Sequence, residues 1–339
     1  MNRPGPANAL TDVRGLTVGH AEHDRWPTGA TVVVAEPAAV AAVDVRGGAP
    51  GSRELALLAP GCLVERVDAV VLAGGSAYGL AAADGVVDRL AAAGRGFAAG
   101  PARVPIVPAL ILFDLRLGPP ERETAAYREL GARAFDRRGA AVGLGNVGAG
   151  RGATCGPLKG GVGSASIVDE RTGATVAALA VVNAAGSAVM PGTATLWAWP
   201  FEQAGEFGGE TPPSRPIPAE VEIHGLTGEN TTLVVVATDA ALDRPQAQRL
   251  AIMAQDGLAR ALRPAHTPVD GDAVVALATA NAGAVDAIEL ARLGAHAADV
   301  TARAVARGVV EATPSDGMPA LRDLRGVGGR PAGPAADEA

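Results

Sequence analysis

The strongest constraint on the fold is an alternation of short apolar runs with longer helical stretches. The runs are rich in Val and end at Gly, Pro, Asp or Thr, which is typical of β-strands. We expect strands at Thr31–Val34, Val40–Val45, Ala69–Leu72, Thr175–Val182, Leu233–Ala237 and Ala273–Ala278. Apolar residues at helical spacing predict helices over Gly79–Ala93, Pro245–Leu262 and Ala287–Glu311, the last interrupted by Gly294 and Gly308. The order predicts a mixed fold without an internal repeat.

This pattern predicts a single domain over residues 1–313, because no clear linker appears before about residue 314. The strongest internal loop signal is Gly205–Pro218, which lies just before the Asn230–Thr231 bond. Beyond Thr313 the composition favours a flexible tail over residues 314–339.

Charge and hydropathy exclude several classes of partner. The chain has 29 basic and 36 acidic residues, and no basic run or basic-aromatic cluster, so we expect no nucleic acid partner. No apolar run is long enough to cross a bilayer, and the N-terminus lacks the apolar core of a signal peptide. We therefore expect a cytoplasmic protein without a membrane partner. Cys62 and Cys155 fit no metal-ligand spacing, which predicts two free thiols.

The chain contains 28 arginines and a single lysine, Lys159. An ammonium is compact and its pKa falls readily on burial, whereas a guanidinium stays charged. In a chain that uses Arg for nearly every other cation, the remaining lysine marks a position that needs these properties. The alternative is an ordinary surface residue.

The junction of Asn230 and Thr231 is a turn that leads into a strand. Locally this is ordinary, since Asn favours turns and Thr favours strands. The pair also permits a reaction, because the Thr hydroxyl can attack the preceding carbonyl through a five-membered ring. Hydrolysis of the resulting ester leaves an N-terminal Thr231, whose α-amine, with a pKa of about 8, can serve as the local base.

Asp270 and Asp272 flank a glycine at the entry to a predicted strand, so both carboxylates can point into one site. Such a pair can orient an N-terminal ammonium or the amine of a substrate. The alternatives are a plain Asp-Gly turn and a metal loop. A single Asp-Gly-Asp without further spaced ligands does not make a metal site.

Two glycine-rich segments resemble other motifs without matching them. Gly145–Gly156 precedes Lys159, but the lysine is followed by two glycines rather than by the Gly-Lys-Ser/Thr order of a phosphate-binding loop. The spacing in Gly74–Gly79 is not that of a serine nucleophile elbow. We interpret this second segment as a strand-to-helix turn that lines a pocket.

The motifs together resemble the self-processing DmpA-type aminopeptidases, peptidase family S58, which include β-peptidyl aminopeptidases and nylon-oligomer hydrolases. The resemblance covers roughly Leu10 to Glu311. The motifs that carry it are PTGATVVV (Pro27–Val34), AAVDVRGG (Ala41–Gly48), VLAGGSAYGL (Val71–Leu80), VPIVPALILFDL (Val104–Leu115), GNVGAGRGAT (Gly145–Thr154), LKGGVGSAS (Leu158–Ser166), ENTTLVVVATD (Glu229–Asp239) and DGD (Asp270–Asp272).

The resemblance implies a four-layer α/β/β/α sandwich of the α+β class, like N-terminal-nucleophile hydrolases, and cleavage into fragments 1–230 and 231–339 that stay together. Thr231 after Asn230 is similar to the nylon-oligomer hydrolase branch, whose site also matches Lys159, Asn183, Asp270 and Asp272. It implies that Thr231 is the nucleophile, Asn183 an oxyanion donor and Lys159 a source of positive potential. The two aspartates would position amines. No metal or cofactor is required.

The resemblance leaves the substrate open. Candidates are aminohexanoate (nylon) oligomers, peptides with a small N-terminal α- or β-amino acid, and other short amides. Acyl transfer of the ornithine acetyltransferase type is a further alternative, although its cleavage context is Ala-Thr. The chain departs from some relatives at Phe113, where they present a tyrosine hydroxyl. The resemblance also implies a homo-oligomer, a tetramer or larger.

Overall fold

The computed structural model describes residues 2–116, 123–214, 216–217, 221, 223–224, 230–280 and 285–328. Its strands are β1 (Leu16–Glu22), β2 (Gly29–Val45), β3 (Gly51–Arg53), β4 (Arg66–Ala73), β5 (Phe97–Ala99), β6 (Ala102–Val104), β7 (Ala109–Ile111), β8 (Thr154–Cys155), β9 (Leu158–Lys159), β10 (Gly161–Val168), β11 (Thr175–Asn183), β12 (Thr231–Thr238) and β13 (Ala273–Ala278). The α-helices are α1 (Ala82–Ala92), α2 (Thr124–Asp136), α3 (Arg244–Ala261), α4 (Ala287–Val310) and α5 (Leu321–Gly328).

One large mixed sheet runs in the order β10-β11-β12-β13-β2-β4-β7-β3, with β1 paired to β2. The long strand β2 joins its two halves. The first part of β2 pairs with β1 and β4, and Val40–Val45 pairs with β13. The register shifts between Val34 and Ala39, where Glu36 and Pro37 interrupt the ladder with β4. Such an irregularity bends a strand and increases its twist, so β2 can pass from one half of the sheet to the other.

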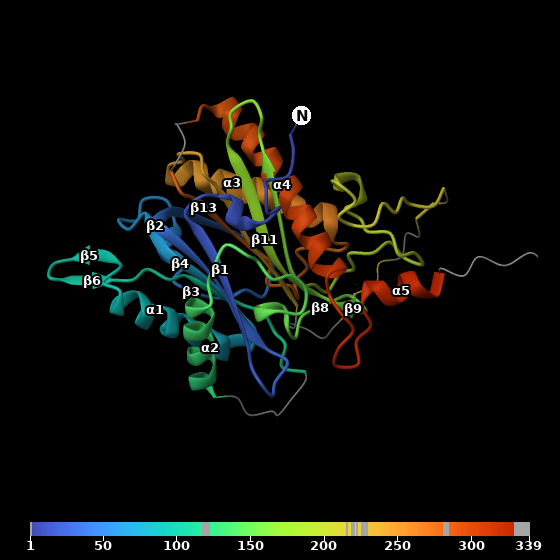
Figure 1. The fold of residues 1–339 in the computed structure, drawn as a ribbon, viewed down its shortest axis with the longest axis horizontal. Helices are drawn as coiled ribbons and strands as arrows, with labels where there is room; N and C mark the ends of the chain where they lie inside the picture. Colours follow the sequence, from blue (N-terminus) through green and yellow to red (C-terminus); the bar gives the residue numbers. More distant parts are fainter. Residues whose placement is uncertain are drawn as a thin grey trace, which may run out of the picture.

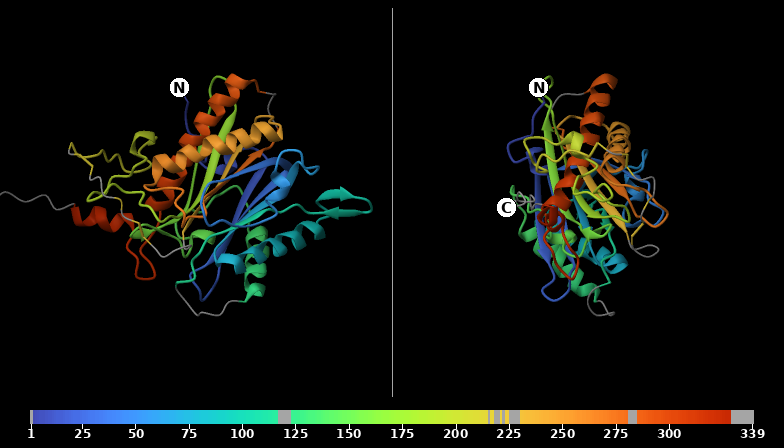
Figure 2. Two further views of the ribbon diagram at one scale, coloured as in Figure 1. Left: turned by 180° about the vertical axis from the view of Figure 1, so that it is seen from behind. Right: turned by 90° about the vertical axis from the view of Figure 1, so that its right-hand side faces the viewer.

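Three apolar interfaces separate four layers (Figures 1 and 2). Helices α3 and α4 pack on one face of β10–β13, where alternate residues such as Val234 and Val236 join their core. The opposite residues, such as Leu233 and Val235, meet residues of β1, β2 and β4 in the central core. Helices α1 and α2 cover the outer face of β2 and β4. The four-layer α/β/β/α sandwich follows from strands that are apolar on both faces.

The expected elements are present with small changes in their bounds. The runs at Thr31–Val34 and Val40–Val45 belong to the single strand β2. Helix α3 has a Pro in its first turn, and the carboxylate of Asp243 accepts a hydrogen bond from Gln246 N at its start. Among the described residues, no helix is both long and apolar enough to cross a bilayer.

Two expectations for the C-terminal part are wrong. Helix α4 runs through Gly294 and Gly308 without a break, because these glycines give room to Met253 and to the backbone of β10. The segment expected to be a flexible tail is ordered to residue 328. It contains α5, where Leu321 is fully buried. Residues 329–339 lie outside the described part of the chain.

His20 on β1 is a half-buried ionisable group beneath the glycine-rich loop, and its Nε2 is buried without a hydrogen-bond partner among the described residues. Its Nδ1 lies 3.0 Å from Thr31 Oγ1, which accepts a hydrogen bond from Ala149 N at 3.1 Å. Burial lowers the pKa of His20 to about 4, against the opposing effect of the Glu22 charge. Because the unfolded chain takes up this proton near its ordinary pKa of 6.5, protonation favours unfolding as the pH falls from 6.5 towards 4.

We predict that His20→Gln makes the stability of the fold less sensitive to acid. Between pH 7 and pH 4 the wild type should lose about 3 kcal/mol more free energy of unfolding than the variant. Urea unfolding at a series of pH values measures this difference. Equal pH dependence in the two proteins would contradict a buried neutral His20.

Candidate active site

The expected site residues lie where β11 ends and β12 begins. Asn183 is the last residue of β11 and Thr231 the first of β12, and the antiparallel register places them directly opposite one another. Both are buried, with 2% and 4% of their surface exposed. The Asn183 amide is held on two sides, because Oδ1 accepts from Thr154 N at 3.0 Å and Nδ2 donates to Phe113 O at 3.1 Å.

The Asp-Gly-Asp turn reaches the same place from the other side of β12. Strand β13 runs parallel to β12, and Asn230 forms a parallel bridge with Asp270. The carboxylate of Asp272 accepts a hydrogen bond from Thr232 N at 2.7 Å and two from His266, from N and Nδ1, each at 2.9 Å. Asp272 therefore connects the segment before β13, which contains His266, to the start of β12 at Thr232.

Asp270 is buried beside Asp272 and makes a separate set of contacts. Its Oδ1 accepts from Ala185 N at 3.2 Å, and its Oδ2 accepts from Thr267 N at 3.1 Å and from Thr267 Oγ1 at 2.5 Å. Burial raises the pKa of Asp270, and the charge of Asp272 raises it further. This carboxyl group therefore takes up a proton more readily than an exposed aspartate.

A second turn supports the Asp-Gly-Asp turn from behind. Gly47 N donates to Asp272 O at 3.1 Å and Ala49 N donates to Asp270 O at 2.8 Å. A Cβ on Gly47 would lie 2.2 Å from Asp272 N and 2.4 Å from Asp270 O. Only glycine allows this approach, which explains the Arg-Gly-Gly end of the AAVDVRGG motif.

The carbonyl group between Asn230 and Thr231 is held at its oxygen. Gly271 N donates to Asn230 O at 2.9 Å, and Thr231 Oγ1 donates to the same oxygen. A Cβ on Gly271 would lie 2.6 Å from Thr231 Oγ1 and 2.8 Å from Ala49 O. The glycine between the two aspartates therefore presents its N–H to the carbonyl and leaves room for the hydroxyl.

Lys159 lies on β9, outside the large sheet that carries these groups. It pairs with Thr154 in the short β8–β9 ladder, and Thr154 N is the donor to the Asn183 amide. Among the described residues, its ammonium donates to Arg151 O at 3.2 Å rather than to Thr231. The expected residues thus form two groups: Thr231, Asn183 and the two aspartates lie together, and Lys159 is connected to Asn183 through Thr154.

The Lys159 side chain is 1% exposed. Burial lowers its pKa to about 8, because the charged form loses its hydration. Asp316 and Asp114 raise this pKa and Arg151 lowers it. Asp316 forms a 2.7 Å ion pair with Arg151, and Pro319 O accepts a hydrogen bond from Lys159 N at 2.8 Å. The segment after α4 therefore covers the lysine.

Thr231 opens into a small cavity of about 190 Å³. Phe113, Ile111 and Leu80 form an apolar part of its lining. Ser76 and Ala77 form another part of the wall, at the start of a short 3₁₀ helix after β4. The prediction that Gly74–Gly79 forms a strand-to-helix turn lining a pocket is confirmed. Phe113, the position at which we expected a departure from some relatives, lies in this wall.

Three contributors were missed from the sequence: His266, Thr267 and the N–H of Gly271. The first two fall in the segment before Asp270, and their ordinary residue types carried no signal. The Gly271 role depends on the pairing of β12 with β13. Within the described residues, no group of three or more His, Cys, Asp or Glu side chains is placed to hold a metal ion.

We predict that Asp272→Asn destabilises the fold by about 3 kcal/mol, because an amide NH₂ would face an N–H donor of Thr232 or His266. Urea unfolding measures the loss. Asp136→Asn is a matched control, since Asp136 pairs with Arg89 at the surface, and it should change stability little. Equal effects of the two substitutions would contradict the role assigned to Asp272.

Known proteins are similar to this chain over most of its length. An uncharacterized aminopeptidase of Mycobacterium bovis is 46% identical, over 94% of this chain and 98% of that protein. The 6-aminohexanoate-oligomer endohydrolase of Paenarthrobacter ureafaciens is 29% identical, over 79% of this chain and 74% of that protein.

Solved structures support the same relationship. A Burkholderia β-aminopeptidase has a TM-score of 0.71 at 26% identity, covering 98% of this chain and 97% of its own. The L-aminopeptidase D-Ala-esterase/amidase of Ochrobactrum anthropi, described as a variant of the Ntn hydrolase fold, has a TM-score of 0.70 at 23% identity, covering 94% and 90%. The expected fold class is confirmed. The profile of peptidase family S58 matches residues 8–321, and the chain belongs to this family of hydrolases.

Proposed function

We propose that this family S58 hydrolase cuts its own Asn230–Thr231 bond and then hydrolyses short amides with Thr231 as the nucleophile. The observation that carries the proposal is the geometry at the Asn230 carbonyl. Its oxygen accepts hydrogen bonds from Gly271 N and from the Thr231 hydroxyl. The nucleophile is thus adjacent to the group it attacks, and a backbone donor already faces the oxygen that becomes negative.

Self-cleavage proceeds by attack of Thr231 Oγ1 on the Asn230 carbonyl carbon. The C–N bond breaks, the Thr231 nitrogen takes up a proton, and Asn230 is left as an ester on the Thr231 oxygen. Water then hydrolyses the ester, which frees the Asn230 carboxylate and the Thr231 hydroxyl. The new α-amine lies beside its own hydroxyl and serves as the base in later turnovers, directly or through one water.

The surrounding groups fit these roles. Gly271 N stabilises the oxyanion, and Asn183 is the second proposed donor because it lies opposite Thr231. Asp270 and Asp272 position the new amine and can hold the amine of a substrate. The positive charge of Lys159 lowers the pKa of the Thr231 α-amine, so that more of it is the free base at neutral pH.

The sheet explains how fragments 1–230 and 231–339 would stay together after the cut. Strands β12 and β13 belong to the second fragment and lie between β11 and β2 of the first. Arg303 of the second fragment is fully buried, and it donates to Glu206 and to Asn8 Oδ1 of the first. Separation would break two strand pairings, which would leave four strand edges exposed, and would uncover a buried charge.

The cavity favours a small acyl group. Its volume of about 190 Å³ and the apolar side chains of Leu80, Ile111 and Phe113 suit alanyl, β-alanyl or similar residues better than large side chains. We therefore place aminopeptidase action on small N-terminal residues first. Hydrolysis of aminohexanoate oligomers is the second candidate, supported by the similarity to the Paenarthrobacter endohydrolase. The aminohexanoyl group of such an oligomer carries no side groups, so it can enter a small cavity.

Initial rates on alanine p-nitroanilide, a β-alanyl amide and a linear aminohexanoate oligomer distinguish these substrates. Adding hydroxylamine or ornithine as an acyl acceptor tests the acyltransferase alternative. We expect hydrolysis of at least one of the first two amides, with water as the acceptor. Acyl transfer to ornithine in preference to water would overturn the hydrolase proposal.

We predict that Thr231→Val abolishes hydrolysis, whereas Thr231→Ser retains activity within about tenfold, because only the serine keeps the nucleophilic hydroxyl. Thr301→Val is a matched control. Thr301 is fully buried on α4, and its hydroxyl has no hydrogen-bond partner among the described residues. The control should keep wild-type rates. Activity that survives in Thr231→Val would rule out Thr231 as the nucleophile.

Gly271→Ala should slow self-cleavage by about 100-fold or more, because the added Cβ would lie 2.6 Å from the attacking hydroxyl and displace it. The time course of fragment formation after synthesis measures the rate. Gly139→Ala serves as the control, since a Cβ there meets nothing within 4 Å. Cleavage of Gly271→Ala at the control rate would contradict the close approach of Gly271 to an attacking Thr231 hydroxyl.

A further inference from the structure

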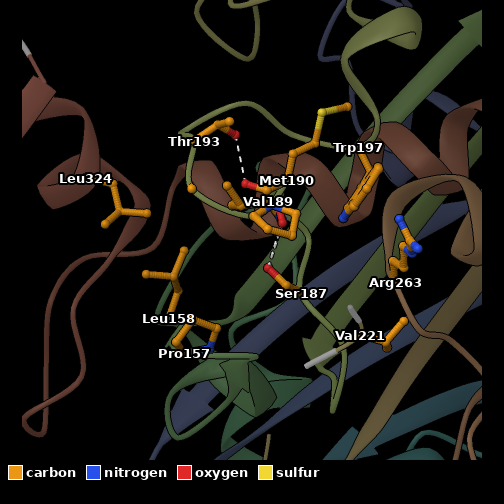
Figure 3. A pocket seen from close by; sticks show the side chains of 12 residues that line it. Pro157, Leu158, Ser187, Val189, Met190, Thr193, Trp197, Val221, Arg263 and Leu324 are labelled. Atoms are coloured by element: carbon orange, nitrogen blue, oxygen red, sulfur yellow. Dashed lines mark hydrogen bonds between the residues drawn. The ribbon is translucent and has the colours of Figure 1, made fainter. Parts of the chain in front are cut away.

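A second cavity, of about 150 Å³, lies outside the Thr231 cavity and shares no lining residue with it. Figure 3 shows its walls. Leu158 and Leu324 lie on one side, and Trp197 and Arg263 lie on the other. Val221 borders it as well, so the cavity adjoins the segment that leads to Asn230.

Arg263 brings a positive charge to this cavity without a matching anion. Its guanidinium carbon lies 5.3 Å from the centre of the Trp197 ring. Within the described part of the chain, its side chain forms no ion pair or hydrogen bond. Its backbone is fixed, because Arg263 N and O exchange hydrogen bonds of 3.0 Å with Ser187. Arg263 is half-buried, so an anion in the cavity would meet a guanidinium that has lost part of its hydration.

The indole of Trp197 adds a donor at the same wall. Its Nε1 is buried and has no hydrogen-bond partner among the described residues. A buried N–H without a partner costs free energy, and a ligand oxygen could accept from it. By contrast, the hydroxyls of Ser187 and Thr193 donate to the carbonyls of Val189 and Met190, so these neighbours are already satisfied.

The remaining lining is aliphatic. Leu158, Leu324, Val189 and Val221 provide contacts for a short hydrocarbon chain. One cation and one N–H donor match the two oxygens of a carboxylate. A phosphate has three oxygens to satisfy and is usually met by several donors or a helix N-terminus. The volume leaves room for a carboxylate and a few methylene groups.

We propose that this cavity is a binding site for short aliphatic carboxylates, with Arg263 and the Trp197 N–H holding the carboxylate. Binding depends on the positive charge of Arg263 and on the N–H of the Trp197 indole. The aliphatic part of the wall limits the length of the hydrocarbon chain of the ligand. The site is independent of cleavage at Thr231, because no catalytic group proposed above lines it.

Binding of hexanoate to the wild-type protein, measured by isothermal titration calorimetry with hexanamide as the neutral analogue, tests the proposal. We expect saturable hexanoate binding that is at least about tenfold tighter than hexanamide binding, since a charged hydrogen bond is lost with the amide. Arg263→Gln should weaken hexanoate binding about tenfold or more, and Trp197→Phe should weaken it several-fold while keeping the ring.

Arg260→Gln is the matched control. Arg260 also lies 5.3 Å from an aromatic ring, that of Phe201, but it pairs with Asp299 at 2.7 Å outside this cavity. The control should bind hexanoate like the wild type, and thermal unfolding checks that all variants are folded. No saturable binding, equal affinity for hexanoate and hexanamide, or equal affinity of the Arg263 and Arg260 variants would overturn the proposal.

Discussion

The site depends on the parallel pairing of β12 with β13. This pairing brings Asp270, Gly271 and Asp272 alongside Asn230, Thr231 and Thr232, residue by residue. A donor therefore reaches the Asn230 carbonyl from a backbone N–H rather than from a side chain. Backbone groups in a sheet need no rotamer ordering at the moment of reaction, so the oxygen is met by a fixed dipole. The aspartates beside the glycine keep this backbone in place through their own hydrogen bonds.

The rest of the fold keeps that pairing rigid. The Gly47 turn supports the Asp-Gly-Asp turn, and β12 and β13 are buried on both faces between α3–α4 and the second half of the sheet. Alternate residues of β12 and β13 pack into two different cores. A register shift by one residue is therefore disfavoured, because it would move every side chain of the strand into the opposite core. The geometry of the proposed site therefore depends on the core packing of the whole sandwich.

Local pattern predicted the elements well because strand and helix formation here follows short-range rules. Val-rich runs gave β4, β11, β12 and β13, and helical spacing located α3 and α4. The Thr231 and aspartate positions followed from their motifs. Local sequence pattern did not predict the features that depend on contacts between residues far apart in the chain. Pro37 lies within the continuous strand β2, because β1 and β13 pair with its two ends. Residues 314–328 are ordered because Asn146 and Lys159 bind Thr313 and Pro319.

The central claim is that Thr231 is made the N-terminus of a fragment by the chain itself. Denaturing mass spectrometry of the purified wild-type protein, with N-terminal sequencing, tests it most directly. Self-cleavage at this bond predicts two fragments of roughly 23 and 11 kDa, the smaller one beginning at Thr231. A single intact chain of 33.7 kDa in a preparation that hydrolyses amides would contradict it.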